Sequence, residues 1–146
     1  MSRTETVTLT NMCMIKNKDK ILVLNRNDPV WPGLTFPGGH VEKHESFHDS
    51  VIREVKEETG LMINRPKLAG VKQFYDHNQH RYIVFFYIAT EFTGQLHASD
   101  EGTLSWMTKN ELLNSKLAYN FDHDLPVYFD EDISEHMLDG QRDELF

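Results

Sequence analysis

Residues 46–60 have the pattern of an amphipathic helix whose apolar stripe contains negative charges. The stretch begins with a Ser-x-x-Asp capping pattern and ends at a glycine. At about 100° per residue, Glu54 and Glu58 fall within about 20° of Phe47, inside the stripe that should face the core. The stripe therefore predicts carboxylates at the edge of a hydrophobic interior, which few folds tolerate without a purpose.

This arrangement works against helix stability. Glu54 and Glu58 are like charges four residues apart, and Glu57 and Glu58 lie in the last turn, where the helix dipole disfavours anions. One interpretation is a solvated acidic face with Arg53 and Lys56 as partners, but solvated charges belong opposite the stripe. A cation-binding site explains the placement better. Carboxylate oxygens without a thiolate suit Mg²⁺ or Mn²⁺, and the glycines at 38–39 would let a backbone carbonyl approach the same ion.

The remaining pattern predicts one α/β domain over residues 1–146. Alternating or continuous apolar residues indicate strands at 6–15, 20–26, 67–75, 81–90 and 103–107, with a short segment at 34–36 and a second capped helix at 108–113. Strands outnumber helices but the helices fall between them, so we expect a mixed sheet flanked by helices. Residues 117–146 are weakly patterned and acidic, and we assign them no element.

Charge and composition exclude several classes of protein. The net charge is −8, and residues 117–146 hold nine acidic side chains against Arg142 alone. A chain without a basic stripe is not expected to bind long nucleic acid. The apolar run 82–89 is too short to cross a bilayer and the first ten residues lack signal-peptide features, so we expect a cytoplasmic protein without a membrane partner. The single cysteine, Cys13, excludes an intrachain disulfide.

Residues 39–61 carry a longer motif around the charged helix. The fixed positions are Gly39, Glu45 after five residues, Arg53-Glu54 after seven more, apolar Val55, Glu57-Glu58, Gly60 and apolar Leu61. This resembles the Nudix box, complete at every specified position. Three further features are similar to Nudix hydrolases: the run 31–37 that leads into the box, the two strands that precede the box, and Glu101 ahead of the strand that ends near Trp106.

The resemblance implies an α/β/α sandwich with a mixed central sheet, and hydrolysis of a nucleoside diphosphate linked to another group. It also implies a set of metal ligands: Glu54, Glu57, Glu58, Glu101 and the carbonyl of Gly38. Arg53 would hold the glutamates, Glu45 would reach the same cluster, and Gly39 and Gly60 would support the box. Mg²⁺, or Mn²⁺ in its place, would offset repulsion between these carboxylates and the substrate phosphates. Glu57 or Glu54 would act as the general base.

The length and the central position of the box are most similar to the MutT-like branch, which includes 8-oxo-dGTP diphosphatases. The expected reaction is therefore cleavage of a nucleoside triphosphate, such as an oxidised purine nucleotide, to the monophosphate and pyrophosphate. Alternatives within the family are ADP-ribose, dinucleoside polyphosphates and RNA 5′ ends. An alternative from another class is a non-catalytic nucleotide-binding regulator, although all three box glutamates are present. A monomer and a homodimer both remain open.

Two asparagines are candidates for reading the base. Asn11 interrupts an apolar strand, and Asn120 lies in a segment with Tyr119 and Phe121. An amide offers a donor and an acceptor together, as recognition of a base edge requires. A satisfied core or turn asparagine is the alternative interpretation for each.

Overall fold

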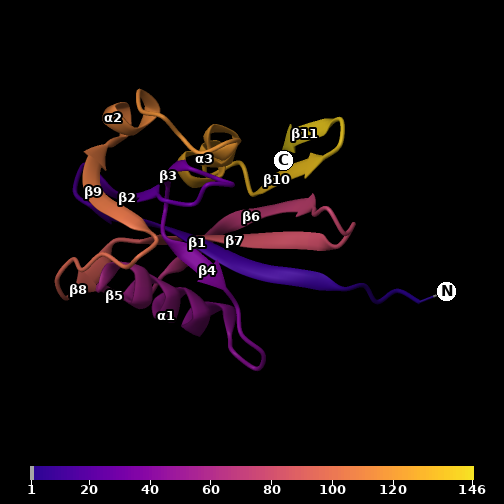
Figure 1. Ribbon diagram of the computed structural model, residues 1–146, viewed down its shortest axis with the longest axis horizontal. Helices are drawn as coiled ribbons and strands as arrows, with labels where there is room; N and C mark the ends of the chain where they lie inside the picture. The colour runs from indigo at the N-terminus through magenta and orange to yellow at the C-terminus, as the bar shows by residue number, and fades with distance from the viewer. Residues whose placement is uncertain (1) are drawn as a thin grey trace.

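A mixed β-sheet lies between two helical layers in the computed structural model, which describes residues 2–146 (Figure 1). The main sheet has the strand order β11-β10-β6-β7-β1-β2-β3, with β4 also paired to β1 and β9 to β2. Its strands are β1 (Val7–Asn17), β2 (Lys20–Arg26), β3 (Gly33–Thr35), β4 (Gly38–His40), β6 (Lys67–Tyr75), β7 (Arg81–Ala89), β9 (Gly102–Thr108), β10 (Glu135–Asp139) and β11 (Arg142–Leu145). A separate pair is formed by β5 (Met62–Asn64) and β8 (Glu91–Thr93).

Strand β1 is the centre of the sheet. It runs parallel to β7 from Val7 to Ile15 and antiparallel to the short strand β4. Both of its faces are buried: Cys13 and Ile15 pack in the core beneath α1, whereas Met12 and Met14 pack in the core on the opposite face. The parallel pairing to β7 and the antiparallel pairing to β2 give the predicted mixed sheet.

Helix α1 (Phe47–Thr59) forms where the sequence predicts it. The Ser46 hydroxyl accepts a hydrogen bond from the backbone N–H of Asp49 at 2.9 Å, as an N-cap should. Gly60 ends the helix with φ +80°, a left-handed conformation that a side chain would strain. Val51 and Val55 are fully buried against the sheet, so the apolar stripe faces inward as expected.

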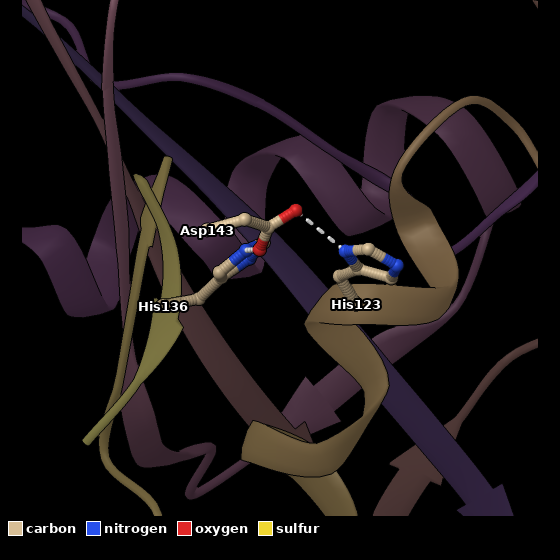
Figure 2. A group of neighbouring side chains, drawn as sticks. All are labelled: His123, His136 and Asp143. Atoms are coloured by element: carbon tan, nitrogen blue, oxygen red, sulfur yellow. Dashed lines mark hydrogen bonds and ion pairs between the residues drawn. The ribbon is translucent and has the colours of Figure 1, made fainter. Parts of the chain in front are cut away.

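Residues 117–146, to which the sequence analysis assigned no element, are folded. They contain helix α3 (Phe121–Phe129) and the hairpin β10–β11, and β10 pairs in parallel with β6. Two buried polar side chains, Asp124 and His136, interrupt the apolar pattern of these elements, and Pro126 lies inside the helix. These interruptions hid the elements from pattern analysis. Figure 2 shows His136 and Asp143 of the hairpin facing His123 of α3.

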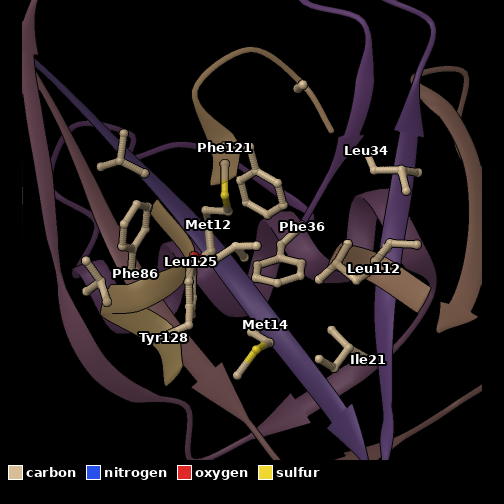
Figure 3. Packing of buried hydrophobic residues seen from close by; sticks show 14 residues of the cluster. Met12, Met14, Ile21, Leu34, Phe36, Phe86, Leu112, Phe121, Leu125 and Tyr128 are labelled. Carbon is tan, nitrogen blue, oxygen red and sulfur yellow. The ribbon is translucent and has the colours of Figure 1, made fainter. Parts of the chain in front are cut away.

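Helix α3 and the shorter helix α2 (Lys109–Leu113) cover the face of the sheet opposite α1 (Figure 1). The ring of Phe36 meets the rings of Phe121 and Tyr128 edge-on, with both centroid distances at 4.9 Å (Figure 3). The hydroxyl of Tyr128 donates to the carbonyl of Met12 at 3.0 Å, which ties α3 to the central strand. No helix within residues 2–146 has the length and apolarity needed to span a membrane.

The packing of α3 predicts the effect of a core substitution in this segment. Phe121→Ala removes a ring that is 0% exposed and should lower the free energy of unfolding by about 3–5 kcal/mol. Leu113→Ala is the control, because Leu113 is 50% exposed and its loss should change stability by about 0.5 kcal/mol or less. Urea denaturation of the two variants measures both values. Equal, small effects would mean that α3 does not belong to the core.

Candidate active site

The strand β4 glycines bring the backbone against the carboxylates of α1. The N–H of Gly38 donates to Oε2 of Glu58 at 3.0 Å, and the N–H of Gly39 donates to Oδ1 of Asn11 at 3.2 Å. A Cβ on Gly39 would lie 2.2 Å from the carboxylate of Glu54. A side chain at residue 39 would therefore displace the Glu54 carboxylate from this position.

Arg53 holds three carboxylates at once. Its guanidinium donates to Glu45 at 2.7 and 3.0 Å, to Glu54 at 2.9 Å and to Glu57 at 3.2 Å. It also donates to the backbone carbonyl of His40 at 2.9 Å, which connects α1 to the end of β4. The guanidinium holds the pKa of Glu45 at about 2, and the carboxylates raise the pKa of Arg53 in turn. Arg53 and Glu45 thus fix the orientation of the other two glutamates.

Glu58 is the most deeply buried carboxyl group of the cluster. It is 5% exposed, and burial together with the neighbouring carboxyl of Glu101 raises its pKa to about 9. Burial also raises the pKa of Glu54. The N–H of Gly38 donates a hydrogen bond to Glu58, and the carboxyl of Glu101 is a further hydrogen-bonding neighbour. A buried acid with an acid beside it is costly for the fold, whereas a divalent cation between the two would stabilise both ionised groups.

The four expected ligand carboxylates do not have equal surroundings. Glu54 and Glu58 are enclosed, whereas the side chain of Glu57 is 58% exposed and is held by Arg53. Glu101 comes from the loop before β9, whose position is fixed by the hydrogen bond from the N–H of Asn27 to the Glu101 carbonyl at 2.9 Å. The structure therefore brings Glu101 to Glu58, although more than forty residues separate them in the sequence.

A cavity of about 700 Å³ adjoins this cluster. Gly38, Gly39 and Glu101 line it, and so do four aromatic side chains that a planar base could stack on: Trp31, Phe74, Tyr82 and Tyr119. Phe74 and Tyr82 are already stacked, with centroids 4.7 Å apart. The same cavity thus combines an acidic backbone-lined region with an aromatic wall, as a phosphorylated aromatic ligand requires.

Both candidate base-reading amides line this cavity. The amide of Asn11 already bonds at both ends, because its Nδ2 donates to the Ser50 hydroxyl at 3.0 Å and its Oδ1 accepts from Gly39. Asn120 precedes α3 with φ +66°, and its Oδ1 accepts from Lys72 at 3.3 Å while its Nδ2 donates to Asp143 at 3.1 Å. Recognition of the base by Asn11 or Asn120 stays a prediction. The hydrogen bonds of Asn11 show that this residue positions Gly39.

The cavity wall also contains a buried ion pair that no sequence pattern predicted. Lys72 of β6 and Asp124 of α3 are 8% and 1% exposed, and their charged atoms are 2.9 Å apart. Asp124 lies among the buried residues Phe121, Leu125 and Tyr128, so it breaks an apolar stripe in the same way as the glutamates of α1. A charged residue in an apolar stripe indicates a site only when the segment is known to be helical. The acidic composition of residues 121–129 hid that helix.

The family assignment agrees with this geometry. The NUDIX domain model matches residues 7–128, and the chain belongs to the Nudix hydrolase family, whose members act on phosphoanhydrides. The chain is 38% identical to the uncharacterized Nudix hydrolase YvcI of Bacillus subtilis, over 88% of this chain and 78% of that protein. It is 34% identical to an ADP-ribose pyrophosphatase of Methanocaldococcus jannaschii, over 76% of this chain and 65% of that protein.

A solved structure shows the same fold. The MutT protein of Bacillus halodurans superposes with a TM-score of 0.78 and is 27% identical, over 95% of this chain and 94% of that one. This similarity confirms the α/β sandwich with a mixed central sheet and its likeness to MutT proteins.

The buried carboxyl of Glu58 leads to a stability prediction that does not depend on catalysis. In the metal-free protein at pH 8, Glu58→Gln should raise the melting temperature by about 2 °C or more. The reason is that the folded-state pKa of Glu58 is raised from 4.5 to about 9, so stability is fully present below pH 4.5 and falls progressively as the pH rises toward 9. Most of this loss has occurred at pH 8, and glutamine avoids it because it does not ionise. Calorimetry in EDTA measures the difference.

Glu131→Gln is the matched control, because Glu131 is exposed and its substitution should leave the melting temperature unchanged. A metal-free Glu58→Gln protein that melts below the wild type at pH 8 would contradict the interpretation of Glu58 as a destabilising buried acid.

Proposed function

We propose that this protein is a Mg²⁺-dependent pyrophosphohydrolase that cleaves a nucleoside triphosphate to the nucleoside monophosphate and pyrophosphate. The observation that carries the proposal is that one cavity is lined both by Gly38, Gly39 and Glu101 and by an aromatic wall. A ligand with a phosphate chain and a base fits this combination of surfaces. The preferred substrate is an oxidised purine nucleotide such as 8-oxo-dGTP.

The donor set fits a hard divalent cation. The ligands would be Glu54, Glu57, Glu58, Glu101 and the carbonyl of Gly38, all of them oxygen donors. The buried Glu58 carboxyl beside Glu101 is the feature that most needs a cation, because no basic side chain among residues 2–146 forms an ion pair with either carboxyl. When bound, Mg²⁺ would neutralise phosphate charge and lower the pKa of a coordinated water; Mn²⁺ would serve in the same donor set.

The protein's own residues would position and deprotonate the nucleophile. Arg53 keeps Glu54 and Glu57 in fixed orientations, and either carboxylate would take a proton from the attacking water. The water oxygen forms a bond to phosphorus, and the anhydride P–O bond breaks with its electron pair leaving on pyrophosphate. Glu57 is the better candidate for the base because it is exposed to solvent. Glu54 is the alternative, because Arg53 holds its carboxylate next to Glu57.

The base would be read by polar groups among the aromatic side chains. Lys72 and Asp124 present a charged donor and acceptor in the cavity, and Asn120 bonds to Lys72. An 8-oxopurine differs from its parent base by one acceptor and one donor, which side chains of this kind can distinguish far better than an apolar pocket. ADP-ribose is a second candidate substrate, since the relative from Methanocaldococcus jannaschii is named an ADP-ribose pyrophosphatase. A non-catalytic regulator is the alternative that a turnover assay excludes.

Removal of a candidate base tests the chemistry. Glu57→Gln should lower kcat by at least ~10²-fold, because the side chain keeps its size but cannot accept a proton. The fold should be retained, because Glu57 is exposed and its substitution relieves repulsion at a helix C-terminus. Pyrophosphate release with Mg²⁺, with EDTA and with the control Glu131→Gln measures the effect. Turnover in EDTA would refute this mechanism, and a Glu57→Gln variant as fast as the wild type would exclude Glu57 as the base.

A substitution in the cavity wall tests base selection. Asn120→Ala should raise KM for 8-oxo-dGTP by ~10-fold while leaving kcat for dGTP within about twofold, because base binding and phosphoryl chemistry use separate residues. Values of kcat/KM for 8-oxo-dGTP, dGTP and ADP-ribose measure the preference. Tyr119→Phe is a control that keeps the ring and removes only an exposed hydroxyl. An unchanged ratio in Asn120→Ala would exclude Asn120, and a wild-type preference for ADP-ribose would replace the proposed substrate.

A further inference from the structure

Outside the Nudix box, one group of side chains has the composition of a transition-metal site. Within the described residues, His123, His136 and Asp143 each offer one ligand atom, and the three atoms lie within 4.8 Å of one another. Figure 2 shows that they come from two elements, with His123 on α3 and the other two on the hairpin β10–β11. We propose that these three residues bind one divalent transition-metal ion with the ligand preference of Zn²⁺, which clamps the hairpin to α3.

The geometry is close to that of a bound site. Nε2 of His136 is 2.7 Å from one oxygen of Asp143, and Nδ1 of His123 is 2.6 Å from the other. Ligands around a tetrahedral zinc ion stand about 3.3 Å apart, given metal–ligand distances of about 2.0–2.1 Å. The His136 pair therefore has to separate by about 0.6 Å and the His123 pair by about 0.7 Å. The side chains of His123 and Asp143 can supply these movements because they are 51% and 33% exposed.

The surroundings of His136 resemble the support of a metal-bound histidine. This ring is 0% exposed, and its Nδ1 lies 2.7 Å from Oδ1 of Asp124. Histidines that bind zinc commonly donate the other ring N–H to a carboxylate, which fixes the orientation of the ring. Asp124 is in turn held by the ammonium of Lys72 at 2.9 Å, so Nε2 of His136 is directed at Asp143.

The two imidazoles separate this site from the Nudix cluster in metal preference. Nitrogen ligands favour Zn²⁺ over Mg²⁺, whereas the all-oxygen set of the box favours Mg²⁺. The exposed edges of His123 and Asp143 give an ion a path from solvent and leave room for water as a further ligand. The competing explanation is a metal-free network, in which a protonated His136 bridges Asp124 and Asp143.

Equilibrium dialysis of the full metal-free chain against Zn²⁺ in excess Mg²⁺ tests the proposal. The wild type should retain one equivalent of Zn²⁺, and its melting temperature should rise on binding. His123→Ala and Asp143→Asn should each weaken Zn²⁺ binding by at least ~10-fold. Loss of a residue that only supports a metal ligand already weakens binding by about this much. His77→Ala removes an exposed histidine from the β6–β7 turn and should bind as the wild type does.

Two further measurements exclude binding at the Nudix box. First, Glu57→Gln should retain the Zn²⁺. Second, Co²⁺ bound to the wild type should give the intense visible absorption of a four-coordinate ion, and this absorption should be absent in His123→Ala. The proposal is overturned if excess Mg²⁺ removes all Zn²⁺, if His123→Ala binds as tightly as the wild type, or if Glu57→Gln alone abolishes binding. A wild type that binds no Zn²⁺ would also overturn the proposal. If His123→Ala then lowers the melting temperature of the metal-free protein, the three side chains form an ion-pair network.

Discussion

The site depends on the contact between Arg53 and its carboxylates. Without this guanidinium, α1 would present several acidic side chains toward a largely apolar interface with no counter-charge, and the His40 carbonyl of β4 would lose its hydrogen bond from the helix. Arginine is suited to the task because its planar donors hold the three carboxylates in fixed directions and it stays charged when partly buried. The helix therefore carries a pre-organised acidic surface, whose remaining repulsion a cation would relieve.

Strand β1 connects this surface to the rest of the cavity. Asn11 bonds to Gly39 on β4 and to Ser50 on α1, so one buried amide sets the distance between the strand, the glycine turn and the helix. On the other face of the same strand, Met12 accepts from Tyr128 of α3. The acidic cluster and the aromatic wall are thus positioned by neighbouring residues of one strand, which explains how a small domain keeps two different surfaces in register.

The sequence was informative wherever a local signal and a packing requirement agreed. Helix α1 could be predicted because its capping residues, its glycine stop and its period all point to the same element, and the misplaced glutamates identified the site. Helix α3 could not be predicted from the sequence, because Pro126 lies inside it and Asp124 occupies a core position. The partner of Asp124 is Lys72, far away in the sequence, and such long-range pairing leaves no periodic trace. The approach of Glu101 to Glu58 was expected only from family resemblance.

The parallel pairing of β1 with β7 also affects how the protein folds. Val7 to Ile15 pair with Arg81 to Ala89, so the central strand gains its main partner only after the intervening chain, including the whole Nudix box, has been closed into a loop. Contacts of this kind raise the contact order and slow folding. The acidic cluster joins α1, β4 and the loop that carries Glu101. A chain whose sheet has not yet closed is therefore expected to have no preformed site with which to bind metal.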